Sequence, residues 1–386
     1  MDYFLDFLKK REKLGTRRSL EKITRLENGK LLINGQEFID FSSNNYLGLL
    51  MDKRLQIASA AFSLSFGSGS GASRLMSGDL EIHHELEIES ANLVGKDEAL
   101  LFGSGFLANI GTISSFVQRT DAIFVDKLAH ASIIDACILS RAKFFRFRHG
   151  DVDHLKWLLK EHRAAFKKVL IVSESIFSMD GDVCPLEELV EIKRHFNTYL
   201  MIDEAHAIGV IGKGGVGLIK ALRLEKEIDI ILATYGKAFA GYGAFVAVNK
   251  ILKDYFINAA RSFIFSTALP PCIVGANLAA IYIAKKEQWR RKKTLANAKI
   301  LRNFLKDKGF KTIGDRHIVP ILIGDERLCQ NISDALKSKG IFVKAIRHPT
   351  VPKGSARLRV SVCTYHNYKD IKKLVDAISD ISKKNN

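Results

Sequence analysis

Two charged side chains directly follow apolar runs that are typical of buried strands. Lys237 ends the segment Asp-Ile-Ile-Leu-Ala-Thr-Tyr-Gly-Lys, and Asp203 ends Tyr-Leu-Met-Ile-Asp. In an α/β sheet, strand ends deliver side chains to a ligand, so a lysine and an acid placed there can act together. A lysine amine can form a Schiff base with a carbonyl compound. Alone, either residue is more often a surface charge or half of a buried ion pair.

A candidate phosphate site accompanies this pair. The run Leu-Leu-Phe-Gly-Ser-Gly-Phe-Leu-Ala (100–108) predicts a strand, a glycine turn and the start of a helix. Main-chain N–H groups at a helix start can bind a phosphate, and the helix dipole favours the anion. Thr234 lies three residues before Lys237, where its hydroxyl can reach the same phosphate. Lysine, carboxylate and phosphate site together are what pyridoxal phosphate requires, since a carboxylate can hold its pyridine nitrogen protonated.

The same glycine run permits a second interpretation. Residues 103–108 match Gly-x-Gly-x-x-Ala, the fingerprint of dinucleotide-binding folds, which by itself is a weak signal. A dehydrogenase would need an acid about 20 residues further on. Asp121 and Asp126 are the candidates, although Asp121 precedes its predicted strand. A nicotinamide-dependent dehydrogenase therefore stays open as an alternative.

Three further polar residues follow predicted strands. His130, in Asp-Lys-Leu-Ala-His-Ala-Ser (126–132), could stack on a flat aromatic ring, or could simply cap a helix. Ser178 lies in Ser-Met-Asp-Gly-Asp and could bond a cofactor or only shape a turn. His206 closes Asp-Glu-Ala-His. These residues gain meaning only together with Lys237 and Asp203.

Composition narrows the class of protein. The 386 residues are 47% hydrophobic and 26% charged, which is ordinary for a globular protein of two or three domains. No apolar stretch reaches the roughly 18 residues of a membrane span, and residues 1–11 predict an amphipathic helix and no signal peptide. The five cysteines are widely spaced without a Cys-x-x-Cys pair, which predicts neither disulfides nor a metal site and fits the reducing cytoplasm.

The net charge of +17 would attract polyanions. Nucleic acid, a coenzyme A thioester and an acidic carrier protein are all candidates. The basic residues are scattered, and no nucleic-acid-binding motif accompanies them, so the charge is weak evidence for any one partner. A nucleic-acid-binding module remains a minor alternative, and we expect neither a nucleic acid nor a membrane partner.

Alternating strand and helix patterns indicate an α/β fold with a mostly parallel sheet and helices on both faces. We expect an N-terminal arm at 1–45, with a hairpin turn at Asn34-Gly35, a large domain at 46–274 and a smaller α+β domain at 275–386. One long helix is expected through Leu278–Lys293, and the last two strands of the large domain should pair antiparallel. The predicted strands of the large domain are Glu98–Phe102, Ala122–Val125, Phe144–Phe147, Val169–Ser173, Leu200–Asp203, Ile228–Ala233 and Ala244–Val248. Those of the last domain are Ile318–Ile323, Phe342–Ile346 and Leu358–Val362, with helices at Leu328–Lys339 and Lys369–Lys383.

Taken in order, the motifs resemble those of the α-oxoamine synthases, a family of fold-type-I pyridoxal-phosphate enzymes. The resemblance runs from about residue 13 to 385, and motifs this numerous and in this order are highly specific. It implies a seven-stranded sheet and a homodimer with shared active sites. The motifs are Ser-Asn-Asn-Tyr-Leu-Gly-Leu (43–49), Gly-Ser-Gly-Ala-Ser-Arg (69–74), Ser-Gly-Phe-x-Ala-Asn (104–109), Asp-x-x-x-His-Ala-Ser (126–132), Phe-Ser-Met-Asp-Gly-Asp (177–182), Asp-Glu-Ala-His (203–206) and Thr-Tyr-Gly-Lys (234–237).

The resemblance also implies a role for each site residue. Lys237, His130 and Asp203 would be catalytic: Lys237 carries the cofactor and then acts as base, Asp203 holds the pyridine nitrogen and His130 stacks on the ring. Other cofactor contacts would come from Gly105, Phe106, Ser178, His206, Thr234 and, across the dimer interface, Thr267. Substrate would be bound by Arg17, Asn44, Arg347 and Thr350, with Arg18 as an alternative to Arg17.

Within the family, residues 345–352 with Gly354 and Arg357–Arg359 are most similar to the branch that joins L-alanine to a pimeloyl thioester in biotin synthesis. The glycine-using branches, 2-amino-3-ketobutyrate ligase and 5-aminolevulinate synthase, usually differ there. The chain departs from the family pattern at Ala207-Ile208, at Val216 and over 238–242. These departures leave alanine, glycine and serine open as substrates. The sequence also leaves both coenzyme A and a carrier protein open as the acyl donor.

Overall fold

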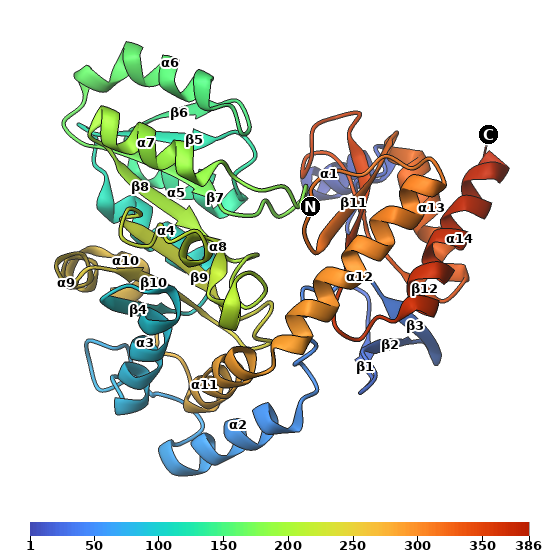
Figure 1. Cartoon of the computed structure of the whole chain (residues 1–386), viewed down its shortest axis with the longest axis horizontal. Coiled ribbons are helices and arrows are strands. Elements are labelled where there is room, and N and C mark those ends of the chain that lie inside the picture. The colour runs from blue at the N-terminus through green and yellow to red at the C-terminus, as the bar shows by residue number, and fades with distance from the viewer. Residues whose placement is uncertain (386) are drawn as a thin grey trace. The chain divides into compact units, whose positions relative to one another are not determined.

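The computed structural model describes residues 1–385, which fall into two compact units (Figure 1). The large unit contains residues 52–178 and 183–291, and the small unit contains residues 1–51, 179–182 and 292–386 as far as they are described. The predicted arm therefore shares a unit with the C-terminal residues. The predicted domain boundaries at 45 and 274 stay a prediction.

The large unit is built on a seven-stranded sheet in the order β4-β10-β9-β8-β7-β5-β6. β10 is antiparallel to both of its neighbours, and the remaining pairs are parallel. The predicted fold class, a mostly parallel sheet with helices, is thus confirmed, as is the antiparallel last pair. The strands are β4 Glu98–Phe102, β5 Ala122–Asp126, β6 Lys143–Phe147, β7 Val169–Glu174, β8 Tyr199–Asp203, β9 Ile230–Thr234 and β10 Ala244–Val248.

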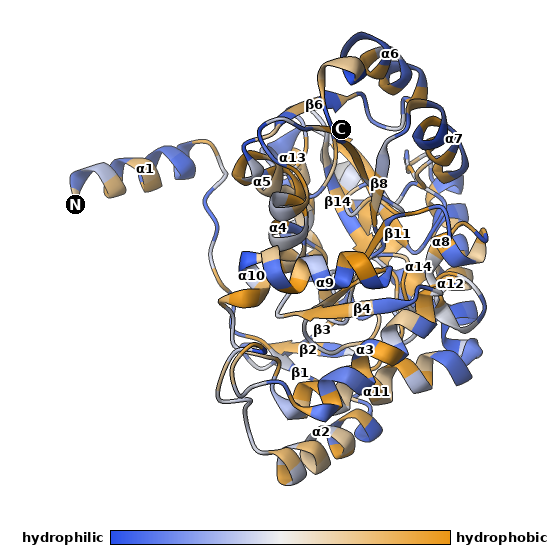
Figure 2. Cartoon of the chain, turned by 90° about the vertical axis from the view of Figure 1, so that its left-hand side faces the viewer, coloured by the Kyte–Doolittle hydropathy of each residue, from blue (hydrophilic) through white to orange (hydrophobic). Residues whose placement is uncertain are grey.

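Helices cover both faces of this sheet. On one face α4 packs against α5, α9 and α10, while α3, α6 and α7 pack against strands from the other. In Figure 2 the sheet strands are mainly orange, whereas α6 and α7 carry both colours, as amphipathic cover helices should. The helices are α2 Lys53–Phe66, α3 Glu81–Val94, α4 Gly105–Phe116, α5 Ala131–Ser140, α6 Val152–His162, α7 Leu186–Phe196, α8 Gly217–Ala221, α9 Lys250–Ala259, α10 Arg261–Ile264 and α11 Pro271–Lys286, with short 3-10 turns η1 Arg163–Ala165 and η2 Lys213–Gly215.

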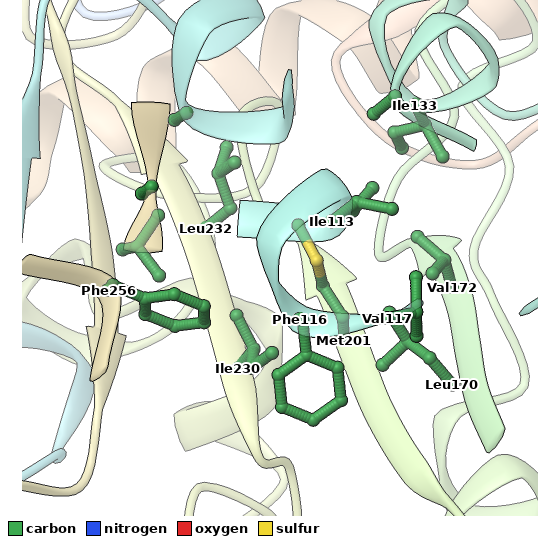
Figure 3. Packing of buried hydrophobic residues seen from close by; sticks show 14 of the residues in the cluster. Ile113, Phe116, Val117, Ile133, Leu170, Val172, Met201, Ile230, Leu232 and Phe256 are labelled. Atoms are coloured by element: carbon green, nitrogen blue, oxygen red, sulfur yellow. The ribbon is translucent and has the colours of Figure 1, made fainter. Parts of the chain in front are cut away.

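The main hydrophobic cluster lies between α4, α5 and one face of the sheet (Figure 3). Alternate residues of the central strands point into it because side chains on a strand alternate between faces. Ile113 and Phe116 from α4 pack on these strand residues, all of them nearly or wholly buried. We call the residues that β7, β8 and β9 contribute to this cluster the apolar floor: Leu170 and Val172 of β7, Met201 of β8, and Ile230 and Leu232 of β9.

The small unit contains two sheets. β12 adds to the N-terminal strands in the order β1-β2-β3-β12, and the second sheet has the order β11-β14-β13. The predicted hairpin is confirmed, since Asn34 and Gly35 join β2 to β3 with φ of 50° and 79°. The elements are α1 Asp2–Lys13, β1 Thr24–Arg25, β2 Lys30–Ile33, β3 Gln36–Asp40, β11 Ile318–Gly324, α13 Glu326–Ser338, β12 Ile341–Phe342, β13 Ala345–Ile346, β14 Ala356–Ser361 and α14 Tyr368–Asn385, with α12 Gln288–Asp307 crossing the boundary between the units.

Two predicted elements are wrong. The single strand expected at Phe342–Ile346 is divided, because β12 pairs with β3 and β13 pairs with β14 in the other sheet. The long helix expected through Leu278–Lys293 is interrupted at Glu287, whose ψ of 68° is not helical. The carboxylate of Glu287 accepts hydrogen bonds from Arg54 and Arg290 there.

Within residues 1–385, no helix combines the length and the apolar composition that crossing a bilayer requires.

Candidate active site

The apolar floor ends in polar residues at the carboxyl ends of three neighbouring parallel strands. Two residues beyond Val172, Met201 and Leu232, on the same face of the sheet, stand Glu174, Asp203 and Thr234. We call these three residues the polar rim. All three are buried. The sheet therefore brings an acid pair and a hydroxyl to one edge, where ligands bind in folds of this type.

Lys237 lies on the loop that follows β9. Its Nζ is 2.9 Å from Nε2 of His206, which is itself on the loop after β8 and is buried. An ammonium group can only donate, so His206 accepts through Nε2 when Lys237 is charged. The predicted lysine and histidine are thus in direct contact.

A chain of hydrogen bonds joins Asp203 to His130. Oδ2 of Asp203 accepts from the amide of Asn109 at 3.1 Å, and the same amide donates to Oγ of Ser132 at 3.0 Å. Ser132 Oγ lies 2.8 Å from Nδ1 of His130, and the main-chain N–H of Ser132 also donates to Nδ1. Nδ1 is therefore an acceptor, and the neutral ring carries its proton on Nε2.

The charges of this cluster act on one another. Desolvation lowers the pKa of His130, with Asp203 opposing the shift and Lys237 adding to it. His130 remains exposed, so a flat aromatic ring could still stack on its imidazole. Burial raises the pKa of Glu174 to about 8, and the charge of Asp203 adds to the effect. His130, Asp203, Glu174 and Lys237 thus form one electrostatic group.

The start of α4 fits a phosphate group. Gly105 and Phe106 are its first two residues, whose N–H groups no helical carbonyl can accept, and Ser104 caps the helix by accepting from Leu107. Thr234 Oγ1 is buried without a hydrogen-bond partner, an unusual and costly state. A Cβ at position 105 would meet Cγ2 of Thr234 at 2.7 Å, so only glycine leaves this space open. The residues present therefore fit a phosphate, with Thr234 as a further donor.

Three other residues were predicted to contact the cofactor: Ser178, Phe106 and Thr267. Ser178 is buried after β7, whereas the side chain of Phe106 is half exposed. Thr267 is exposed and pairs with Ser73 through an isolated bridge. Their assignment to the cofactor stays a prediction.

The four predicted substrate residues belong to the small unit. Arg17, Arg347 and Thr350 line one cleft of about 580 Å³, together with Arg18, whose guanidinium is 3.5 Å from the hydroxyl of Thr350. Asn44 is not among the lining residues. Its Oδ1 instead accepts from Arg359 and from the hydroxyl of Tyr46.

Three residues of the site were missed from the sequence: Asn109, Ser132 and Glu174. Asn109 and Ser132 lie within motifs and Glu174 ends a predicted strand region, but only register and helix packing place them beside Asp203 or His130. A signal for Glu174 was present, because an acid closing an otherwise apolar strand needs a compensating partner.

Comparison with known proteins decides the family. Residues 36–378 match the family described as aminotransferase class I and II. The chain belongs to this family. Among curated relatives, 8-amino-7-oxononanoate synthase of Geobacter sulfurreducens is 41% identical over 96% of this chain and 95% of its own length. A putative 8-amino-7-oxononanoate synthase of Geobacillus kaustophilus is 44% identical over 90% of each chain.

Solved structures agree. Serine palmitoyltransferase of Sphingomonas wittichii superposes with a TM-score of 0.93 at 27% identity, covering 99% of this chain and 98% of that one. 8-Amino-7-oxononanoate synthase of Francisella tularensis gives a TM-score of 0.80 at 30% identity, covering 90% and 98%. The predicted membership of the α-oxoamine synthases is confirmed, as is the fold-type-I architecture. The cofactor of the protein is pyridoxal phosphate.

The dehydrogenase alternative is set aside with this family membership. One of its two candidate acids is also engaged elsewhere, since the carboxylate of Asp126 accepts from the N–H groups of Leu128 and Gly150 and bonds His149. Asp126 is therefore engaged in closing its own loop.

Proposed function

We propose that the protein joins L-alanine to a pimeloyl thioester, releasing CO2 and a free thiol and giving 8-amino-7-oxononanoate for biotin synthesis. The proposal is carried by the full-length likeness to relatives of that name at about 40% identity, combined with the contact between Lys237 and His206. When bound, pyridoxal phosphate supplies an electron sink for the α-carbon of the amino acid. The protein supplies the positions and the protons.

Lys237 is the proposed covalent attachment point and the base. Its Nζ lies on the loop after β9, and His206 holds it there at a distance of 2.9 Å. A base can act only if it reaches the proton that it removes. An amine held beside the cofactor would be within reach of the α-proton of a bound amino acid. Lys237 would therefore take the α-proton of alanine at Nζ and later return a proton to the product.

Asp203 and His130 would orient the ring. Two donors, the Asn109 amide and the main-chain N–H of Ala205, hold the Asp203 carboxylate in position. This anion is suited to keep a ring nitrogen protonated. His130 offers a flat face, held by Ser132, while Gly105, Phe106 and Thr234 would bind the phosphate.

The cleft of the small unit is the proposed site for the acyl substrate. Arg17, Arg18 and Arg347 supply guanidinium groups, which pair well with carboxylates. A pimeloyl chain ends in a carboxylate, unlike an acetyl or palmitoyl chain. We therefore assign this cleft to the distal carboxylate, with Thr350 as a neutral partner and Asn44 as a further substrate residue.

The test is a substrate matrix. Purified enzyme is assayed for free thiol with alanine, glycine or serine against pimeloyl-, acetyl- or palmitoyl-coenzyme A, and with pimeloyl carrier protein. The alanine and pimeloyl pair should give the highest kcat/KM. A preference for glycine with acetyl-coenzyme A would instead indicate a 2-amino-3-ketobutyrate ligase, and preference for serine with palmitoyl-coenzyme A would indicate a serine palmitoyltransferase.

We further propose a cytoplasmic homodimer in which Thr267 serves the phosphate of the second subunit. The exposed position of Thr267 supports this proposal, and all five cysteines are free thiols, as in a reducing compartment. Sedimentation of the holoenzyme should give a dimer. A stable and fully active monomer would exclude shared sites.

A further inference from the structure

Glu174 is a buried carboxyl group that the proposed reaction leaves without a task. It is the last residue of β7 and is 3% exposed. Its register partner across the parallel pair is Asp203 of β8. Register partners in a sheet point to the same face, so two carboxyl groups lie side by side in the polar rim.

Glu174 and Asp203 are each connected to His130 by hydrogen bonds. The main-chain N–H of His130 donates to Glu174 Oε1 at 2.7 Å. The ring of His130 is tied through Ser132 and Asn109 to Asp203, the neighbour of Glu174 in the sheet. One acid thus holds the backbone of His130, and the other holds its side chain through two intermediaries.

Two adjacent buried carboxyl groups cannot both ionise without a large cost. Asp203 accepts from an amide and from a main-chain N–H, whereas Glu174 accepts from one main-chain N–H only. The negative charge is therefore better stabilised on Asp203. Burial and the charge of Asp203, with a smaller contribution from Asp126, raise the pKa of Glu174, while Lys237 and the N–H of His130 oppose the shift.

We propose that Glu174 is a positioning residue that holds a proton at neutral pH, fixes the main chain of His130 and leaves Asp203 as the one charged carboxylate of the polar rim. The proposal rests on the proposed function for the tasks of His130 and Asp203. The protonation of Glu174 and its hydrogen bond to His130 are properties of the apoprotein. They can therefore be tested without measuring turnover.

The test compares Glu174→Gln with Glu174→Ala in the apoprotein. Glutamine keeps a neutral side chain whose oxygen can accept the N–H of His130, and alanine removes that acceptor. The ring pKa of His130 is measured by NMR of histidine-labelled protein, with a His130→Asn variant to assign the signal. Glu204→Gln is the matched control, because Glu204 is also fully buried but accepts from Leu218 and Ile219.

We expect Glu174→Gln and the control to leave the pKa of His130 unchanged. Glu174→Ala should move it back toward its ordinary value, because water reaches the loosened loop. A further fall of the pKa in Glu174→Gln would show that a negative charge had been removed, and would overturn the proposal. An unchanged pKa in Glu174→Ala would overturn it as well.

A second measurement covers the case in which Glu174→Ala does not fold. The pKa of Glu174 is raised from 4.5 to about 8, so the folded apoprotein binds a proton that the unfolded chain releases in this window. Stability of the native apoprotein then falls as pH rises from about 5 to 8, and Glu174→Gln escapes this loss. The stability gap in favour of Glu174→Gln should widen across the window. A constant gap would contradict the protonated state, whatever substrate the enzyme uses.

Discussion

The apolar floor and the polar rim lie on the same three strands and on the same face of the sheet, one residue pair apart. The floor packs against α4 and α5 in the main hydrophobic cluster, whereas the rim carries an orphaned hydroxyl and two adjacent carboxyl groups. Burial is nearly complete in both regions. The difference is therefore one of polarity: the floor stabilises the fold, and the rim gives up stability to hold groups ready for a ligand.

The largest effect is expected from Lys237→Ala. Loss of the amine should lower kcat by at least about 10²–10⁴-fold, the usual contribution of a positioned acid or base, while the unfolding temperature of the apoprotein stays the same. Turnover is measured as thiol release. Lys250→Ala, which removes an exposed lysine at the start of α9, is the matched control and should retain full activity.

Asp203→Asn should impair the activity that depends on the polar rim without changing the packing of the apolar floor. The amide keeps the shape and one acceptor oxygen but lacks the negative charge that stabilises a cationic ring nitrogen, so kcat should fall by about 10²–10³-fold, as for other lost electrostatic contacts. Far-ultraviolet circular dichroism should show an unchanged fold. Retention of full turnover would remove Asp203 from the catalytic set.

Met201→Ala addresses the floor directly below Asp203. A wholly buried methionine is lost, which should cost about 2–5 kcal/mol of unfolding free energy. Activity per folded molecule should be retained, since no polar group changes. Denaturant titration and thiol release on the same sample separate the two quantities. A selective loss of activity would show that the floor also shapes the site.

Thr234→Val should weaken the binding of the cofactor phosphate without lowering the stability of the apoprotein. Because Oγ1 has no partner in the apoprotein, its replacement by a methyl group should leave the apoprotein equally stable or more so. Phosphate binding should weaken by about 1.5–3 kcal/mol, the worth of one hydrogen bond to a charged group. Cofactor titration by absorbance gives the Kd. A clearly destabilised apoprotein would mean that the hydroxyl is already satisfied.

The smallest effect concerns Glu204, the residue after Asp203. Burial raises its pKa from 4.5 to about 7, against the N–H groups of Ile219 and Leu218. The folded protein then holds a proton that the unfolded chain loses, so stability falls as pH rises from about 4.5 to 7 and is level above. Glu204→Gln should remove this part of the pH dependence in thermal unfolding of the apoprotein. An identical pH dependence in both proteins would show that Glu204 is ionised.

The same contrast explains what could be predicted from sequence. The central strands, the Asn34-Gly35 hairpin and the strand-end position of Lys237 follow from local periodicity and turn chemistry. The division of 342–346 between two sheets depends on pairing with β3 and β14, which no local pattern encodes. Glu174 could not be assigned to the site from the sequence for the same reason. Its place beside Asp203 depends on the register of β7 with β8.

The central claim is that Lys237 binds pyridoxal phosphate covalently beside Asp203. Holoenzyme reconstituted with pyridoxal phosphate and reduced with borohydride should, after proteolysis, yield one pyridoxyl-modified peptide, with the modification on Lys237. Modification of a different lysine, or none after reconstitution, would contradict the account.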